Sequence, residues 1–88
     1  MKEKELEKVL KALANKRRVA IIKYLKHADG VSVGEMAEKI KLSFKATSKH
    51  LIILYGANVV EKEQVGLVVF YFLPKNTHPM VTKLLSII

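Results

Sequence analysis

The sequence of 88 residues contains no cysteine. Disulfide bonds, thiolate zinc sites and cysteine nucleophiles are therefore all excluded, and cysteine usage says nothing about the redox compartment. Half of the residues are hydrophobic, which suits a packed core and not a disordered chain. A domain of this size is nevertheless only marginally stable by itself and gains from oligomerisation.

Long apolar runs are also missing. No segment approaches the roughly 20 apolar residues that a transmembrane helix requires. The chain begins with the charged residues Lys2 to Glu5, and an amphipathic pattern follows them in place of the apolar core of a signal peptide. We therefore expect a soluble cytoplasmic protein with no membrane partner.

The signatures of catalysis and metal binding are absent as well. The sequence has no glycine-rich phosphate loop, no pair of carboxylates on one helix face and no Ser/His/Asp spacing of note. Its three histidines, His27, His50 and His78, have no helical partner four residues away and no clustered carboxylates. We expect no enzyme activity, no cofactor and no metal site.

Acidic residues are scarce where cations gather. The chain has 16 lysines and arginines against 8 acidic residues, a net charge of +8. Between Glu38 and Glu61 there is no acidic residue at all, while the window contains Lys39, Lys41, Lys45 and Lys49. This balance favours a polyanionic partner, either nucleic acid or an anionic membrane surface.

Apolar periodicity predicts five helices, the last of which begins at Pro79. The first four are expected at residues 3–14, 16–27, 33–40 and 44–56. Asn15 and Ser43 are predicted N-caps, and Ser32 with Glu35 fits a capping box. Asn58 can take the left-handed conformation that ends the fourth helix.

Residues 59–63 and 67–73 are rich in β-branched and aromatic side chains, and a short segment ending at Gly66 separates them. This pattern predicts a β-hairpin. Four helices, a hairpin and a closing helix describe a winged helix. We therefore expect one domain over residues 1–88, mainly α with a small β-hairpin (α+β), with about five helices and a two- or three-stranded wing.

Four segments carry a resemblance to a known family. They are Leu10–Asn15 followed by Arg18–Ile22, then Ser48-Lys49-His50-Leu51, then Ala57–Val60 and finally Phe70–Leu73. In this order and spacing the chain resembles the ArsR-type winged-helix repressors. The resemblance implies a homodimeric DNA-binding repressor in which the first and last helices form the dimer interface.

The resemblance also bears on sensing. Many members of that family sense metals through a Cys-x-Cys in the third helix, and the two positions align here with Ser32 and Gly34. A second family site uses acidic and histidine ligands on the final helix, but residues 79–88 contain no Asp, Glu or His. We therefore expect neither metal site.

The fourth helix is the predicted recognition helix, because its N-terminal turns present lysine, serine and histidine. Lysine can donate to phosphate or to guanine, serine can bind either, and Phe44 and Ala46 can touch a thymine methyl. Ser43 can also receive a phosphate at the helix end. The candidate DNA-binding residues are Ser43, Phe44, Lys45, Ala46, Ser48, Lys49, His50, Lys16, Arg17, Lys62 and Gln64.

Several of these residues have alternative interpretations. The window could be only a solvated lysine-rich face, Phe44 could be buried at the corner between two helices, and His50 could be a structural histidine bonded to backbone. We expect Arg18 to tie the first helices together and Thr47 to pack inward. The wing tip contains no arginine, so Lys62 and Gln64 are expected to make at most peripheral phosphate contacts.

The segments 1–14 and 79–88 carry more apolar surface than a core of this size needs, and we expect them to form a two-fold dimer interface. Its candidate residues are Leu6, Val9, Leu10, Leu13, Met80, Val81, Leu84, Leu85 and Ile88. The alternative is that both stripes pack onto their own subunit. A dimer would place two recognition helices about one DNA turn apart, on a palindromic double-stranded operator.

Two other functions remain open at this point. The domain could be a winged helix used for protein–protein assembly, in which case the basic charge would be spread evenly around the fold. It could also be an interfacial membrane binder that uses the apolar C-terminal helix, although few cations lie there to attract anionic lipids.

Overall fold

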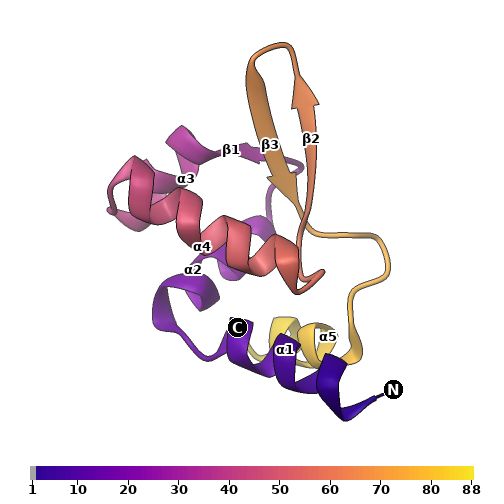
Figure 1. The fold of residues 1–88 in the computed structure, drawn as a ribbon. Helices are drawn as coiled ribbons and strands as arrows, with labels where there is room; N and C mark the ends of the chain where they lie inside the picture. The colour runs from indigo at the N-terminus through magenta and orange to yellow at the C-terminus, as the bar shows by residue number, and fades with distance from the viewer. Residues whose placement is uncertain (1) are drawn as a thin grey trace.

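The computed structural model describes residues 2–88, so Met1 of the predicted first segment lies outside the described residues. Within them the order of elements is helix, helix, strand, helix, helix, hairpin and helix (Figure 1). The bounds are α1 Glu3–Leu13, α2 Lys16–Leu25, β1 Val31–Ser32, α3 Val33–Ile40, α4 Phe44–Gly56, β2 Glu61–Val65, β3 Val68–Phe72 and α5 Pro79–Ile87. The predicted architecture, mainly α with a small wing, is confirmed.

Side-chain caps decide where three of the helices begin. The Asn15 side chain accepts from the backbone N–H groups of Arg17 and Arg18, at 2.9 and 3.1 Å. The hydroxyls of Ser32 and Ser43 accept at the starts of α3 and α4. Each cap satisfies N–H groups that have no partner within the helix, and all three were predicted.

Glu35 does not complete the predicted capping box. Its carboxylate accepts from the hydroxyl of Tyr24 at 2.8 Å, so it ties α3 to α2. Only the serine half of the motif forms, in which the Ser32 hydroxyl accepts from the Glu35 N–H at 3.2 Å.

The sheet has the strand order β1-β3-β2, with both pairs antiparallel. Val31 pairs with Tyr71, and Val65 pairs with Val68 across the hairpin. Because Val65 pairs with Val68, Gly66 and Leu67 form a two-residue hairpin turn. Gly66 has a φ of +63° at the first position of this turn, a conformation that suits glycine. The turn is therefore shorter than the predicted segment 64–66, and it includes Leu67.

The first strand of the hairpin also begins later than predicted, at Glu61 and not at Val59. Asn58 takes the expected left-handed conformation, with a φ of +60°. The Val59 N–H then donates to the Leu54 carbonyl at 2.9 Å and closes α4. Val59 and Val60 are consequently buried under the end of α4 and belong to the core.

The core lies where the helices meet the base of the wing. Its fully buried side chains are Ile21, Ile22, Leu25, Met36, Leu51, Leu54, Val31, Val59, Val60, Val81 and Thr47. The hairpin β2–β3 projects from the end of the molecule opposite α1 and α5 (Figure 1). No helix of the described chain is both long enough and apolar enough to cross a membrane.

Two residues on α4 test this assignment of the core. Leu54 is 0% exposed and Ile52 is 58% exposed. We expect Leu54→Ala to lower the free energy of unfolding by about 2–5 kcal/mol, because it leaves a cavity in the core. Ile52→Ala is the matched control and should change it by about 0.5 kcal/mol or less. Chemical denaturation measures both; equal losses would contradict the proposed orientation of α4.

Candidate nucleic-acid interface

A left-handed residue and two hydrogen bonds fix the turn between α3 and α4. Lys41 adopts a left-handed conformation with a φ of +56°, which turns the chain sharply after α3. The Leu42 N–H donates to the Ala37 carbonyl at 3.0 Å. The Arg17 guanidinium of α2 donates to the Ile40 carbonyl at 3.3 Å. These bonds set the direction in which α4 leaves α3, as in a helix-turn-helix.

Opposite faces of α4 have opposite characters. Thr47, Leu51 and Leu54 are fully buried, and the Thr47 hydroxyl donates to the Ser43 carbonyl at 2.8 Å. Lys45, Lys49 and Ile52 are exposed on the other face, with Ser48 half-buried beside them. Spacings of three and four residues place these four side chains in one row. The helix is therefore anchored by its apolar side and presents a mixed cationic and apolar row to solvent.

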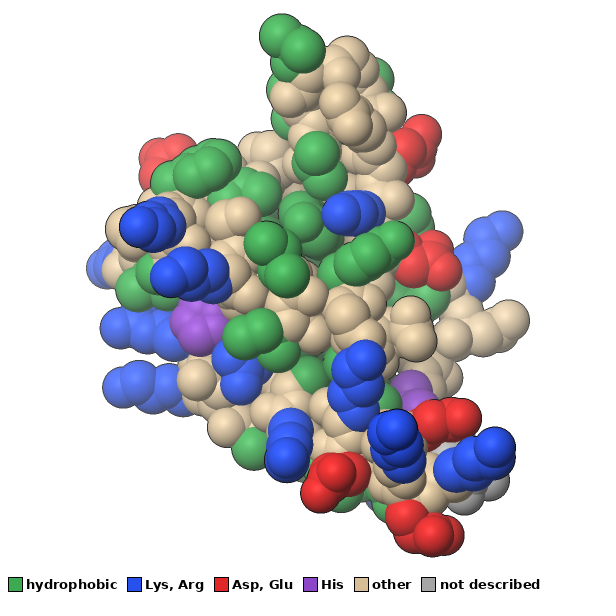
Figure 2. Space-filling view, in the orientation of Figure 1, with side chains coloured by type: hydrophobic (Ala, Val, Ile, Leu, Met, Phe, Trp, Pro, Cys, Tyr) green, Lys and Arg blue, Asp and Glu red, His purple; other side chains and the backbone are tan. Residues whose placement is uncertain are grey.

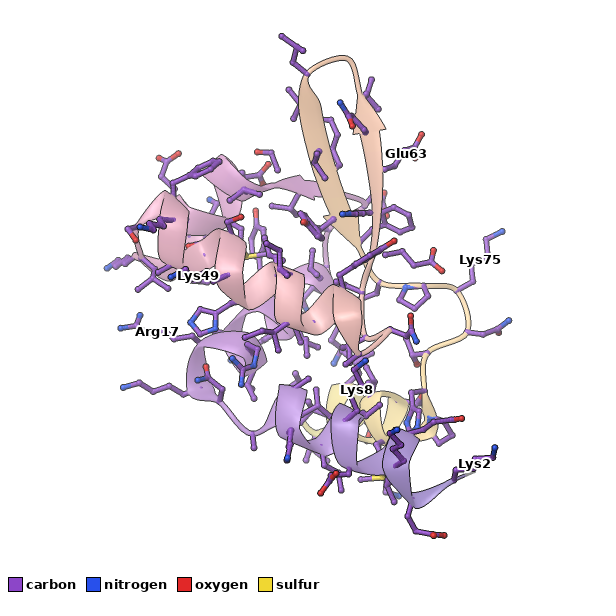
Figure 3. All side chains as sticks on the ribbon, in the orientation of Figure 1. Lys2, Lys8, Arg17, Lys49, Glu63 and Lys75 are labelled. Atoms are coloured by element: carbon purple, nitrogen blue, oxygen red, sulfur yellow. The ribbon has the colours of Figure 1, made fainter. Side chains whose placement is uncertain are left out.

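Cations of other elements lie near this row. Figure 3 shows Lys49 of α4 and Arg17 of α2 on the same side of the molecule. In Figure 2 several blue Lys and Arg side chains gather at this side, and red acidic side chains are sparse among them. Lys16 is exposed at the start of α2, and Arg17 is half-buried because its guanidinium reaches Ile40. The fold thus brings together the cations of α2 and α4 that were predicted as DNA contacts.

Phe44 is not buried at the corner between α3 and α4. Its side chain is 62% exposed, and it lines an open groove of about 440 Å³ with Ser48, Leu67 and Val68. This groove lies between the N-terminal ends of α3 and α4 and the wing. The burial alternative for Phe44 is therefore wrong, and Ala46 is half-buried.

His50 is bound to a side chain and not to backbone. Its Nδ1 lies 3.1 Å from Nη1 of Arg18. Because a guanidinium can only donate, Nδ1 must carry a lone pair, and the neutral ring then carries its proton on Nε2. Burial, followed by the positive charges of Arg18 and Arg17, lowers the pKa of His50 below its ordinary value. This arrangement gives His50 a structural role.

Arg18 joins α1, α2 and α4. Its guanidinium donates to the Ala12 carbonyl at 2.6 Å and to the Lys11 carbonyl at 3.3 Å, in addition to His50. The first two bonds occupy carbonyls at the C-terminal end of α1 that the helix leaves free, where a positive charge is also favoured. The predicted structural role of Arg18 is confirmed.

The wing offers little positive charge. Nζ of Lys62 lies 4.4 Å from the centroid of the Tyr55 ring, so this cation packs on the end of α4. The Gln64 side chain donates to the Gly66 carbonyl at 3.1 Å. The tip is apolar, since Val65 and Val68 are exposed and Leu67 is 99% exposed. Lys62 and Gln64 are both engaged inside the subunit, which agrees with the minor role expected of them.

Two exposed apolar residues in this region were missed in the sequence. Ile52 lies seven residues after Lys45, so the helical spacing itself could have identified it as a member of the exposed row. Leu67 had no such signal, because it was assigned to the returning strand and only the tight turn exposes it.

The α1 and α5 helices lie at the same end of the molecule (Figure 1). Of the nine predicted interface residues, Val9 and Val81 are buried in the core of their own subunit and offer no surface to a partner. Leu10 and Met80 are exposed, and the others are half-buried: Leu6, Leu13, Leu84, Leu85 and Ile88. An open groove along α1 is lined by Leu6, Leu10 and Ala14 together with the charged residues Glu3, Glu7 and Lys11. The alternative in which the stripes pack onto their own subunit is therefore correct for Val9 and Val81, and the outward side of each helix remains a predicted interface.

Among residues 2–88, no group of three His, Cys, Asp or Glu side chains is placed to hold a metal ion. At the positions where the resemblance places metal-binding cysteines, the Ser32 hydroxyl is a helix cap and Gly34 is an exposed helical residue. Neither residue offers a soft sulfur ligand such as a thiolate.

These features define a winged helix-turn-helix of the DNA-binding type: α3, its tight turn and α4, followed by the β2–β3 wing. The chain belongs to the ArsR family, since the family described as "Bacterial regulatory protein, arsR family" matches residues 15–62. Members of this family are transcriptional regulators and not enzymes.

Similar proteins agree with this assignment. The HTH-type transcriptional regulator YbzH of Bacillus subtilis is 30% identical over 77 residues, covering 72% of this chain and 77% of YbzH. The transcriptional activator HlyU of Vibrio cholerae is 38% identical over 65 residues, covering 74% of this chain and 59% of HlyU. The solved structure of HlyU has a TM-score of 0.80 at 30% identity, with 97% of this chain and 88% of that chain covered.

A third relative has a described assembly. The structure of the homodimeric winged helix-turn-helix DNA-binding domain Mb0332 from Mycobacterium bovis has a TM-score of 0.81 at 25% identity. The match covers 96% of this chain and 74% of that chain.

The Arg18–His50 bond predicts a dependence of stability on pH. The pKa of His50 is lowered in the folded protein, so the unfolded chain binds the proton more readily. The stabilisation is therefore complete above the ordinary pKa of 6.5 and is lost as the pH falls through the lower folded value. We expect the free energy of unfolding to fall as the pH is lowered through this range, by no more than about 1.4 kcal/mol per pH unit for one proton.

Urea unfolding at a series of pH values measures this effect. His50→Gln is the comparison, because glutamine can still accept from Arg18 but does not titrate in this range. The variant should lose less stability than the original chain as the pH falls, because the two proteins differ only at position 50. A constant difference in stability between the two proteins would contradict the role assigned to His50.

Proposed function

We propose that the protein is a homodimeric, sequence-specific repressor that binds a palindromic double-stranded DNA operator. The observation that carries the proposal is the exposed row of Lys45, Ser48, Lys49 and Ile52, on a helix whose other face is fully buried. A helix fixed in this way can enter the major groove without losing core contacts. Acting on DNA would place the protein in the cytoplasm.

Each residue of the row has a chemical task in this proposal. Lys45 and Lys49 neutralise phosphates or donate to guanine, and Ser48 donates to a base edge or a phosphate. Ile52 and Phe44 are apolar and exposed, so they suit the methyl groups of thymine. Lys16 and Arg17 contact the DNA backbone, and Ser43 presents the free N–H groups of the α4 N-terminus to a phosphate.

The dimer is proposed from the exposed apolar side chains of α1 and α5. Leu10 and Met80 are 42% and 38% exposed, and Leu6, Leu10 and Ala14 contribute apolar surface to the groove along α1. An apolar surface of this kind on a small domain favours burial against a second copy. The relative from Mycobacterium bovis is homodimeric, which supports the proposal of a homodimer. Two-fold pairing then implies an operator with two-fold symmetry.

Repression is proposed because a dimer that occupies a promoter excludes the polymerase. Genomic footprinting of the purified protein would identify the promoter. Transcription from that promoter in vitro should then fall when the protein is added, whereas a rise would make it an activator, as HlyU is named.

The DNA contacts can be ranked by substitution. We expect Lys45→Gln and Lys49→Gln each to weaken operator binding by roughly tenfold near 0.1 M salt, and to reduce the slope of log affinity against log salt by about 1. Lys62→Gln is the matched control and should weaken binding by less than about twofold. The Lys62 ammonium lies on the Tyr55 ring, and an ion pair that it forms with a phosphate in this exposed position contributes little. Fluorescence anisotropy at several salt concentrations measures all three. Equal losses for Lys45 and Lys62 would refute the ranking, and a flat salt response would refute DNA binding through phosphates.

The dimer surface can be tested by adding a charge. Two-fold symmetry places a Leu10→Glu substitution in the interface twice, so we expect the dimer dissociation constant to rise by at least about 100-fold. Leu67→Glu is the matched control, since Leu67 is also exposed but lies at the tip of the wing, and it should leave the dimer unchanged. Sedimentation equilibrium distinguishes the two. A Leu10→Glu protein that stays dimeric would show that another surface pairs the subunits.

A further inference from the structure

A second basic feature lies between α2 and the C-terminal end of α3, apart from the row on α4. It is an open cavity of about 520 Å³. Three of its lining residues, Ala20, Tyr24 and Ile40, are apolar or aromatic, and we call this apolar lining the floor. The cationic side chains of Arg17, Lys23 and Lys39, which we call the rim, and the imidazole of His27 complete the lining. Of the residues that line the cavity in the described chain, none is acidic.

Bonds between α2 and α3 hold the walls of this cavity in place. The Arg17 guanidinium donates to the Ile40 carbonyl at 3.3 Å. The Tyr24 hydroxyl donates to the Glu35 carboxylate at 2.8 Å, which fixes the ring that forms the floor. Nζ of Lys39 lies 5.9 Å from the centroid of the same ring. The cavity is thus formed by positioned side chains of two helices.

We propose that this cavity binds a small amphipathic anion, which has an aromatic or aliphatic body and a single acidic group, and that this ligand regulates DNA binding. The apolar floor removes the body from water, and the cations of the rim pair with the acid. Apolar walls with a few converging polar groups are typical of small-molecule sites. A simple inorganic anion would leave the floor unused, and a neutral apolar compound would leave the cations unused. The DNA backbone has no apolar body that matches this floor.

The position of Arg17 suggests how binding acts on DNA recognition. Its bond to Ile40 lies one residue before Lys41, whose left-handed conformation turns the chain toward α4. An anion in the cavity draws the Arg17 guanidinium away from that carbonyl, because a charged acceptor is the stronger partner. The turn that orients α4 then loses one of its supports. Ligand binding by itself does not depend on the proposed DNA-binding function, but this regulatory consequence does.

The binding step can be tested on the full chain with 2-naphthoate as the probe. Backbone amide NMR shifts should saturate at Ala20, Tyr24, Lys39 and Ile40. The neutral isostere 2-naphthamide and inorganic phosphate should each bind at least about fivefold more weakly. The amide has no charge to pair with the cations, and phosphate has no apolar body to cover the floor.

Substitutions locate the site. We expect Lys39→Gln to weaken naphthoate binding by about threefold to fivefold, whereas Lys75→Gln removes the same charge elsewhere and should have no effect. Figure 3 shows Lys75 on the opposite side of the molecule from Arg17. Ala20→Met should fill the floor and also weaken binding, and an unchanged NMR spectrum away from the cavity confirms that each variant is folded.

Several outcomes would overturn the proposal. Equal binding of naphthoate and naphthamide would remove the role of the cations, and equal binding of phosphate would make the cavity a plain phosphate site such as a DNA contact. Shifts that centre on Lys45 and Lys49 would place the anion on α4. In an anisotropy titration with the footprinted operator, naphthoate should weaken DNA binding by the original chain, and Lys39→Gln should require about threefold to fivefold more naphthoate for the same effect. If naphthoate binds but DNA affinity is unchanged, the regulatory role is refuted; if no operator binds at all, the proposed function fails while the site stands.

Discussion

The guanidinium of Arg18 connects the first helix of the domain to α4 through hydrogen bonds. It donates to two carbonyls at the end of α1 and to the Nδ1 atom of His50 on α4. The first helix belongs to the surface proposed for dimer formation, and α4 carries the row proposed to contact DNA. In the proposed dimer, this hydrogen-bonded link would connect the paired surface of each subunit to its α4. Because the histidine must be neutral to accept the bond, the link is also sensitive to protonation.

The chemistry of the proposed DNA surface is uneven. The N-terminal part of α4 combines lysines with exposed Phe44 and Ile52, while the wing tip is apolar and its lysine lies on Tyr55. In the proposed complex, electrostatic attraction to phosphate would come mainly from α2 and α4. Apolar contacts with base methyl groups would supply a means of discrimination that salt does not screen. Both kinds of contact would be made by α4, so a substitution there would affect affinity and specificity together.

The 88 residues contain no cysteine, so they offer no thiol of their own for metal or redox sensing. The positions that resemble a metal-binding pair are occupied by Ser32, which caps α3, and by Gly34. The cavity between α2 and α3 offers a different route, through Arg17 and the turn that it supports. A ligand at that point would act on the orientation of α4 through one hydrogen bond and without a large rearrangement of the core.

The sequence by itself determined the order of the elements, the three helix caps and the apolar face of α4. These features depend on residues within a few positions of one another, so local spacing is sufficient to predict them. It also indicated the basic surface, since acidic residues are missing over a long window. Only the tertiary structure decided the partners of long side chains: Arg18 with His50, Lys62 with Tyr55, and Arg17 with Ile40. It likewise decided that Val9 and Val81 face inward and that Leu67 faces solvent. Side-chain partners and exposure of this kind depend on how elements far apart in the chain pack together. The periodicity of a single helix or strand contains no information about that packing.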